Sequence, residues 1–551
     1  MTKPPVVKSV PFAFCCYFIL PLASVLAQTN EPKDIPLLHV GFAQVDITPV
    51  RPTPMAGYYG KRLSTETHDP LWAKATVMDD GKNSIALISI DLIATTHWLT
   101  DETRRIIKSQ SGLAPEHVLI TATHSHTGPV LYDPNSSRYN RFGNDADETK
   151  QYMLELPSKI AESVAKAAAA KQPVAVRHAI GQETQLAFNR RFFMTDGTVG
   201  WNPGKLNPRI VREAGPTDDR LPMVGFYNQQ RELIGLLSNF SIHLDTVGGT
   251  QWSADMPFAL EQALGRVFGQ KCHLQYSTGC CGDVNHIDVR NGFDQKGHAE
   301  AARIGTRLAG SVLRSINKLE PTTGTRLHAT KQMVKLPLAN DSSDRLKAAN
   351  QERIEWAKSI SERANSDKPA PFMEMVEAFR ILDVDARNGE PIEAEVQVIS
   401  LGKEIAWVSL PGEIFVQLGL AIKDGSPFDT TTISELANGS VGYVPTRQAY
   451  AQGNYEVVSA RCAAGSGEML VDSALQQLRK HYEIQNMFPT SLLKSFIARE
   501  GEAPAEPLHR WLGRSLALPK VFNGIDFAKM FTGVASPTRV MTQPRPQEQS
   551  P

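Results

Sequence analysis

The sequence has no excess of charge of either sign. It contains 58 Lys and Arg residues and 58 Asp and Glu residues, so its formal net charge near neutral pH is zero. Proteins that bind nucleic acids through the phosphate backbone usually carry a marked basic excess. Because this chain has none, we expect no nucleic-acid partner and no general attraction to an acidic membrane surface.

Several common catalytic and nucleotide-binding motifs are also missing. The sequence contains no Gly-x-Ser-x-Gly segment, so Ser125, which lies between two histidines, lacks the context of a typical serine hydrolase nucleophile. Gly-x-Gly-x-x-Gly and Walker A patterns are absent, which argues against a dinucleotide or nucleoside triphosphate site. We also find no internal repeat and no coiled-coil pattern.

Cysteine is scarce. The chain has six cysteines, and Cys15 and Cys16 lie in an apolar segment near the N-terminus. The other four lack the spacing of a zinc ribbon and are Cys272, Cys280, Cys281 and Cys462. An oxidising compartment permits up to two disulfides among them, so we interpret them as structural thiols or disulfides whose pairing the sequence does not define.

The N-terminal segment has the pattern of a secretory signal peptide. Lys3 and Lys8 precede an apolar run from about Val10 to Leu26, followed by Ala27 and a polar stretch. We expect cleavage after Ala27 and a secreted or periplasmic protein. A signal anchor retained in the membrane is the alternative, although the run is short for a spanning helix.

The remaining sequence predicts an α/β fold. With 551 residues, 41% of them hydrophobic, the chain can bury a large core. Residues 37–49 and 84–93 have strand patterns, whereas 100–112 and 147–170 have helix patterns, the first with Thr100 as its N-cap. The alternation continues along the chain and predicts mixed β-sheets flanked by helices, with strand-end loops forming the functional site.

We expect three segments in the chain. Residues 1–27 form the signal peptide, residues 28–490 form one catalytic domain, and residues 491–551 form a C-terminal extension with a disordered Pro/Gln-rich tail. Within the catalytic domain, the polar helical stretch 340–371 is predicted to be a surface excursion or a lid.

Side chains with metal-binding chemistry follow several predicted strands. His124 and His126 follow one strand, and His243 and Glu413 follow two others. Zinc takes three or four nitrogen, oxygen or sulfur ligands, generally from separate loops. The recurrence therefore indicates a zinc site, although each motif alone is also compatible with structural histidines or with an acid at a helix start.

Residues 123–129, THSHTGP, resemble the His-x-His-x-Gly-Pro segment of the neutral/alkaline non-lysosomal ceramidase family. Further segments resemble those of the family in the same order: VGFAQVDITP with MAGY, SNFSIHLDT, GDVN where the family has GDVS, LPGE, and GYVPTRQAYAQGNYE, which is similar to YxTTxEEYxxQxYE. The common order is more specific than any single motif, and the resemblance covers residues 37–485.

The resemblance implies a set of site residues. The family's zinc ligands correspond to His124, His243, Glu413 and Tyr443, a mixed nitrogen and oxygen donor set that suits zinc. The positions that contact the scissile amide and stabilise its oxyanion correspond to His126 and Tyr455. An Asn-Arg pair of the substrate channel corresponds to Asn189 and Arg190.

The sequence departs from the family pattern in two places. Asn285, followed by His286, replaces a serine near the zinc, and asparagine cannot be acylated. Either activated water suffices, or His286 and Asp283 position that water, or the activity has changed; Asp283 can equally structure its loop. Only a short segment follows Tyr455, so we expect no C-terminal β-sandwich domain of the kind that the family carries.

The resemblance implies an exported zinc-dependent hydrolase that cleaves the amide bond of ceramide or a related N-acyl lipid by metal-activated water. The implied cofactor is Zn²⁺, and the implied partner is a small lipid-like substrate. Transient contact with a membrane surface stays open. Two alternatives stay open: a zinc esterase or deacetylase acting on another substrate, and a non-catalytic relative that binds a lipid or glycan. The oligomeric state is not defined by the sequence.

Overall fold

A computed structural model of the protein describes residues 38–133, 142, 146–339, 344–364, 366 and 368–486. The predicted signal peptide, its cleavage site and the C-terminal extension from residue 491 lie outside these residues. All of these described residues belong to one compact unit. Among the described residues, no helix combines the length and apolar character needed to span a bilayer.

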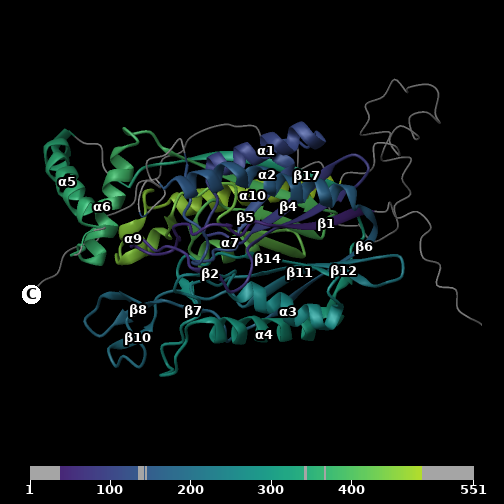
Figure 1. The fold of residues 1–551 in the computed structure, drawn as a ribbon, viewed down its shortest axis with the longest axis horizontal. Helices are drawn as coiled ribbons and strands as arrows, with labels where there is room; N and C mark the ends of the chain where they lie inside the picture. Colours follow the sequence, from purple (N-terminus) through teal and green to yellow (C-terminus); the bar gives the residue numbers. More distant parts are fainter. Residues whose placement is uncertain are drawn as a thin grey trace, which may run out of the picture. The chain divides into compact units, whose positions relative to one another are not determined.

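The larger of two main sheets has nine strands in the order β14-β12-β11-β6-β1-β3-β4-β5, with β16 beside β6 (Figure 1). Most neighbours are antiparallel, but β4 and β5 pair in parallel, as do β12 and β14, which makes the sheet mixed. The strands are β1 (Leu38–Asp46), β3 (Trp72–Asp79), β4 (Ser84–Ile90), β5 (Val118–Ala122), β6 (Gln172–Gln182), β11 (Arg220–Tyr227), β12 (Leu233–Phe240), β14 (His273–Thr278) and β16 (Glu320–Pro321).

The second main sheet packs against one face of the first. Its order is β17 (Leu327–Leu336), β18 (Ile392–Leu401), β19 (Ile405–Ser409) and β21 (Thr430–Ser434). One buried cluster joins residues of both sheets, including Leu87 and Leu119 from the first and Ile399 and Trp407 from the second. Because neighbouring residues of a strand face opposite sides, Ile88 and Ile120 point to the other face.

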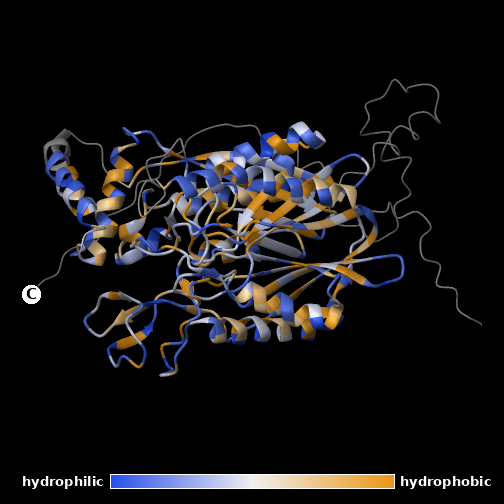
Figure 2. Cartoon of the chain, in the orientation of Figure 1, coloured by the Kyte–Doolittle hydropathy of each residue, from blue (hydrophilic) through white to orange (hydrophobic). Residues whose placement is uncertain are grey.

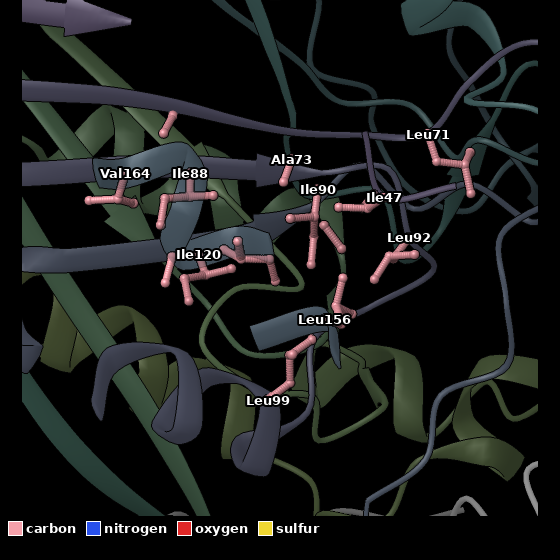
Figure 3. Close-up of a cluster of buried hydrophobic side chains, with 14 of the residues drawn as sticks. Ile47, Leu71, Ala73, Ile88, Ile90, Leu92, Leu99, Ile120, Leu156 and Val164 are labelled. Carbon is pink, nitrogen blue, oxygen red and sulfur yellow. The ribbon is translucent and has the colours of Figure 1, made fainter. Parts of the chain in front are cut away.

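Helices cover the outer faces of both sheets. The helices α1 (His97–Ser111), α2 (Asp147–Ala169), α3 (Met256–Phe268) and α4 (His298–Ser315) pack on the first sheet, and α7 (Val416–Gly425) and α10 (Ser466–Asn486) pack on the second. Figure 3 shows Leu99 of α1 and Leu156 of α2 against Ile88 and Ile120. In Figure 2, the apolar colour lies on the strands and the inner helix faces. The predicted α/β class with flanked mixed sheets is confirmed.

The N-cap of α1 is Thr96, so the prediction of Thr100 was wrong. Thr96 has an extended backbone, and its hydroxyl accepts a hydrogen bond from the Leu99 N–H at 3.0 Å. Thr100 lies one turn inside the helix and is buried. The helix therefore starts earlier because Leu99 packs into the core beneath the sheet.

Between β17 and β18 the chain forms a helical hairpin of α5 (Asp344–Arg363) and α6 (Phe372–Asp385), as the helical pattern of 340–371 indicated. The smaller elements are β2 (Glu66–Thr67), β7 (Phe188–Asn189), β8 (Arg191–Met194), β9 (Val199–Trp201), β10 (Ile210–Glu213), β13 (Gln251–Trp252), β15 (Val284–Asn285), β20 (Glu413–Ile414), β22 (Tyr443–Val444), α8 (Arg447–Tyr450), α9 (Tyr455–Ser459) and 3-10 turns at Pro115–His117 and Ile316–Lys318.

The four described cysteines are buried free thiols, namely Cys272, Cys280, Cys281 and Cys462. Of the two interpretations that the sequence allowed, structural thiols are therefore present in place of disulfides. Burial raises the pKa of the Cys272 thiol to about 11, which keeps that thiol protonated and unreactive near neutral pH.

Three parallel strand pairs place the functional loops together. The pairs β4–β5, β12–β14 and β19–β21 each bring two carboxyl ends to the same edge of a sheet. Backbone hydrogen bonds then join the loops, because the Glu435 N–H donates to Thr278 O at 3.1 Å and the Asn438 N–H donates to Ile120 O at 2.9 Å. The loops after β5, β12, β14 and β19 therefore meet at one place.

Candidate metal centre

Three imidazoles converge where these loops meet. The Nε2 atom of His243 lies 3.1 Å from Nε2 of His124 and 3.1 Å from Nε2 of His126, and the latter two are 3.5 Å apart. Ligands bonded to one ion at about 2.0–2.1 Å lie roughly 3.0–3.4 Å apart. This triangle of nitrogen atoms therefore has the size that a single transition-metal ion requires.

The backbone fixes His124 in a conformation that few residues other than glycine adopt. Its φ is 76°, its N–H donates to Leu92 O at 2.9 Å, and its Nδ1 lies 2.6 Å from Ile93 O. A carbonyl at this nitrogen selects the tautomer with hydrogen on Nδ1, which leaves the Nε2 lone pair directed to the triangle. The strained backbone thus directs one candidate ligand atom to the triangle.

The intervening loop is anchored by hydroxyl groups. Ser125 Oγ and Thr127 Oγ1 both donate to Ser253 O, at 2.6 and 2.9 Å. Ser125 is fully buried, which agrees with the absence of a nucleophile motif around it. The two hydroxyls tie the His-x-His segment to the backbone at Ser253, and the positive φ of His124 directs both imidazoles to His243.

Glu413 and Tyr443 are brought side by side by the short parallel pair β20–β22, in which they are direct register partners. Glu413 Oε2 lies 3.5 Å from His124 Nε2. Burial alone would raise the pKa of Glu413, but the hydrogen bond and charge of His124, together with a hydrogen bond from Tyr443, lower it. A carboxylate therefore stands at one corner of the imidazole triangle.

The close approach of these loops depends on glycine. A Cβ on Gly282 would lie 2.5 Å from Glu413 O, and one on Gly412, whose φ is 155°, would lie 2.5 Å from Gly442 O. No larger residue fits at either position without moving a loop that carries Glu413 or Tyr443.

Burial keeps two of the imidazoles neutral. It lowers the pKa of His126 to about 4, an effect that the charge of Asp245 only partly offsets, and it lowers the pKa of His243 well below its usual range. Neutral imidazole is the form that binds metal. Burial and then the charge of Glu413 raise the pKa of Tyr443 well above its usual range, so without a cation its hydroxyl stays protonated.

Arg190 links the predicted ligands to a buried ion pair. Its Nη2 donates to Tyr443 Oη at 3.1 Å and to Gly282 O at 2.7 Å, and its Nε donates to Glu456 Oε1 at 2.9 Å. Arg191 binds the other Glu456 oxygen at 2.7 Å. Arg190 is therefore held beside Tyr443, and its role in a substrate channel stays a prediction.

Tyr455, the predicted oxyanion donor, lies beside Tyr443, with ring centroids 5.3 Å apart. Its other neighbours are aromatic: the ring centroids of Trp201 and Phe372 lie 4.4 and 5.4 Å away. Phe372 begins α6, so the helical hairpin contributes to this aromatic cluster. The Tyr455 ring thus lies between Tyr443 on one side and the aromatic rings of Trp201 and Phe372 on the other.

Three of the predicted residues bond to neighbouring loops instead of the imidazoles. Asn189 Nδ2 donates to Asp283 Oδ2 and Pro216 O, both at 3.0 Å. Asn285 Nδ2 donates to Asn202 Oδ1 at 3.0 Å. The third residue, His286, has its Nε2 2.7 Å from Gln295 O.

Asp283 also accepts a hydrogen bond from the Val416 N–H at 2.7 Å, and burial raises its pKa to about 6. Its two oxygens are thus occupied by Asn189 and by the backbone of α7. These contacts give Asp283 the loop-structuring role that was one of its two interpretations.

Asp245 and Glu456 also lie among these residues but were not predicted from the sequence. Asp245 follows His243 by two residues, and its Oδ1 lies 3.6 Å from His126 Nδ1. Glu456 follows Tyr455 and is fully buried. A signal existed in both cases, because each acid lies within a motif that also carries a predicted site residue.

A second group of potential ligands, His68, Asp69 and His298, lies elsewhere among the described residues. The two imidazoles stack face to face, with centroids 3.6 Å apart and planes at 15°. An ion in the plane of one ring would lie well out of the plane of the other, so this arrangement does not match imidazole coordination.

The fold matches two solved ceramidase structures. A neutral ceramidase from Pseudomonas aeruginosa superposes with a TM-score of 0.63 and 18% sequence identity, covering 81% of this chain and 75% of that one. A ceramidase complexed with C2 gives a TM-score of 0.62 and 17% identity, covering 81% and 76%. No family model matches the sequence. The chain therefore has a neutral-ceramidase-like fold, as the motif order predicted.

Proposed function

We propose that the protein is an exported zinc-dependent hydrolase that cleaves the amide bond of ceramide or a related N-acyl lipid. The observation that carries this proposal is the convergence of His124, His126 and His243 within a ceramidase-like fold. The export step rests on the signal-peptide pattern of residues 1–27. The lipid substrate is inferred from the ceramidases whose fold the chain shares.

The donor set fits a zinc ion. His124, His243, Glu413 and Tyr443 would hold it, with Nε2 of His126 near enough to serve as a further donor. Two imidazoles, a carboxylate and a phenol suit zinc better than Ca²⁺ or Mg²⁺, which prefer oxygen ligands alone. When bound, zinc supplies a Lewis acid that polarises a carbonyl and activates water.

The protein's own residues have separate tasks in this proposal. Arg190 donates to Tyr443 Oη and so orients the phenol beside Glu413. Tyr455, whose ring lies beside that of Tyr443, donates a hydrogen bond to the substrate carbonyl oxygen as negative charge develops there. The aromatic cluster of Trp201, Phe372 and Tyr455 packs against the acyl chain and keeps water away from it.

A non-catalytic relative is the competing interpretation, because Asn285 stands where the family has serine and its amide bonds to Asn202. The complete set of nitrogen and oxygen donors favours catalysis, since a binding module has no need of one. A zinc esterase or deacetylase would use the same donors on a different bond.

The test combines metal analysis with turnover. We expect the purified mature protein to contain about one zinc per chain and to cleave short-chain fluorescent ceramide. His124→Ala should lose the zinc and at least about 100-fold of the activity, more than is typical for a residue outside the ligand set. His39→Ala, which removes an exposed histidine of β1, is the matched control and should behave like wild type.

Two results would count against the proposal. Stoichiometric zinc without amide cleavage would favour the esterase or the binding protein. Full ceramide hydrolysis by His124→Ala would exclude the assigned site altogether.

A further inference from the structure

His126 differs from the other two imidazoles at its second nitrogen. Nδ1 of His124 is bound to a carbonyl, and Nδ1 of His243 lies 3.5 Å from Arg190 Nη1. Nδ1 of His126 is buried and has no hydrogen-bond partner among the described residues. Asp245 Oδ1 faces it at 3.6 Å, too far for a hydrogen bond.

The carboxylate oxygen that faces His126 already accepts one hydrogen bond. The phenol of Tyr58 donates a short hydrogen bond to Asp245 Oδ1, the same atom. The Tyr58 ring also meets the His126 ring edge-on, with centroids 5.7 Å apart. Tyr58 and His126 thus face the same carboxylate oxygen, and in this structure the oxygen bonds to Tyr58 and stays 3.6 Å from Nδ1 of His126.

The backbone under this cluster is tightly packed, whereas the Tyr58 residue is partly exposed. Arg62 donates to His126 O at 2.7 Å and stacks over the Tyr58 ring at 4.2 Å. Gly57 packs so closely that a Cβ there would lie 2.8 Å from His126 Cβ. The Tyr58 side chain, by contrast, is 39% exposed, so its hydroxyl can turn to solvent without crossing the core.

Resting on the proposed function, we propose that Asp245 is a positioning residue for His126 and that Tyr58 competes with His126 for it. When Tyr58 turns away, Asp245 Oδ1 accepts the Nδ1–H of His126. That hydrogen bond fixes the tautomer whose Nε2 carries a lone pair directed at His124 and His243. With Tyr58 in place, His126 lacks this support. Tyr58 therefore opposes, and Asp245 promotes, the tautomer of His126 that carries hydrogen on Nδ1.

The first test reads the tautomer in the zinc-free protein. Histidine labelled with ¹⁵N distinguishes hydrogen on Nδ1 from hydrogen on Nε2 by the chemical shifts of the two nitrogens. We expect Tyr58→Phe to increase the Nδ1–H form of His126 and Asp245→Ala to abolish its preference. Asp294→Ala, which removes an exposed acid of the loop after β15, is the matched control. Identical His126 shifts in all four proteins would overturn the proposal.

The second test separates positioning from a structural role. We expect Asp245→Ala to lower kcat about 10–100-fold with little change in KM, and Tyr58→Phe to keep or raise kcat. Asp245→Asn should recover part of the loss, because its amide oxygen still accepts from Nδ1. An equal loss in Asp245→Ala and Tyr58→Phe would show that the Tyr58–Asp245 bond is merely structural, and it would refute competition.

The two proposals fail in different ways. If the wild-type protein binds no zinc and cleaves no ceramide, the proposed function is wrong, and the tautomer comparison still decides the role of Asp245. If turnover is normal and the ¹⁵N shifts of His126 do not change in Asp245→Ala, only the positioning role is wrong.

Discussion

Glu456→Gln should destabilise the protein more than any other single charge-neutralising change near the site. The carboxylate is fully buried and binds the Arg190 Nε at 2.9 Å and the Arg191 Nη1 at 2.7 Å. Both guanidinium groups are themselves buried, with side-chain exposures of 4% and 2%. Glutamine keeps one acceptor oxygen but turns an N–H₂ group toward a guanidinium donor.

The expected magnitude follows from the burial. Removing one member of a buried ion pair typically costs about 3–5 kcal/mol, because the partner charge stays desolvated without compensation. Here two arginines share one carboxylate, so the upper part of that range is expected. Arg190 also holds Tyr443, and its displacement should lower activity as well.

Urea unfolding of the wild type and Glu456→Gln measures this cost. The matched control is Glu102→Gln, which removes the carboxylate of the exposed Glu102–Arg105 pair on α1 and should leave the free energy of unfolding nearly unchanged. If Glu456→Gln were as stable as Glu102→Gln, the buried ion pair would not support the site, and our reasoning about Arg190 would be wrong.

Three further predictions concern strain, pH and thiols. Gly57→Ala should cost about 1–3 kcal/mol of stability and reduce activity, because φ is +107° and the added Cβ meets His126; unfolding and turnover of the variant measure both. Burial raises the pKa of Asp91 from 3.8 to about 7, so the folded state binds the Asp91 proton more tightly than the unfolded chain does. The resulting stabilisation is lost as pH rises from about 4 to 7. In urea unfolding, Asp91→Asn should lose that pH dependence. The four cysteines of the described core should react with a thiol reagent only after denaturation, and slow reaction even in denaturant would indicate disulfides.

Local patterns were sufficient for the main elements. The alternation in residues 37–49 predicted β1, and the helical period of 147–170 predicted α2, because in both cases one face packs on the core. The predicted N-cap of α1 was wrong because threonine is an equally good cap at position 96 and at position 100. Only the packing of Leu99 decides between them.

Contacts between distant segments could not be predicted from the sequence. Glu413 and Tyr443 were identified through motif resemblance, but their pairing in β20–β22 depends on tertiary structure. Glu456 reaches Arg190 across 266 positions of the chain, and no periodicity reveals such a contact. The resemblance assigned His126 to the scissile amide and its oxyanion and left it out of the ligand set, whereas its Nε2 lies as close to His243 as that of His124 does.

X-ray absorption at the zinc edge of the purified protein tests most directly whether the strand-end loops hold one metal ion. Our account predicts about one zinc per chain, with nitrogen and oxygen neighbours at about 2.0–2.1 Å and the outer-shell scattering of at least two imidazoles. That imidazole scattering should disappear or halve in His243→Ala. A spectrum with oxygen neighbours alone, or with sulfur, would contradict the assignment of His124 and His243 as ligands.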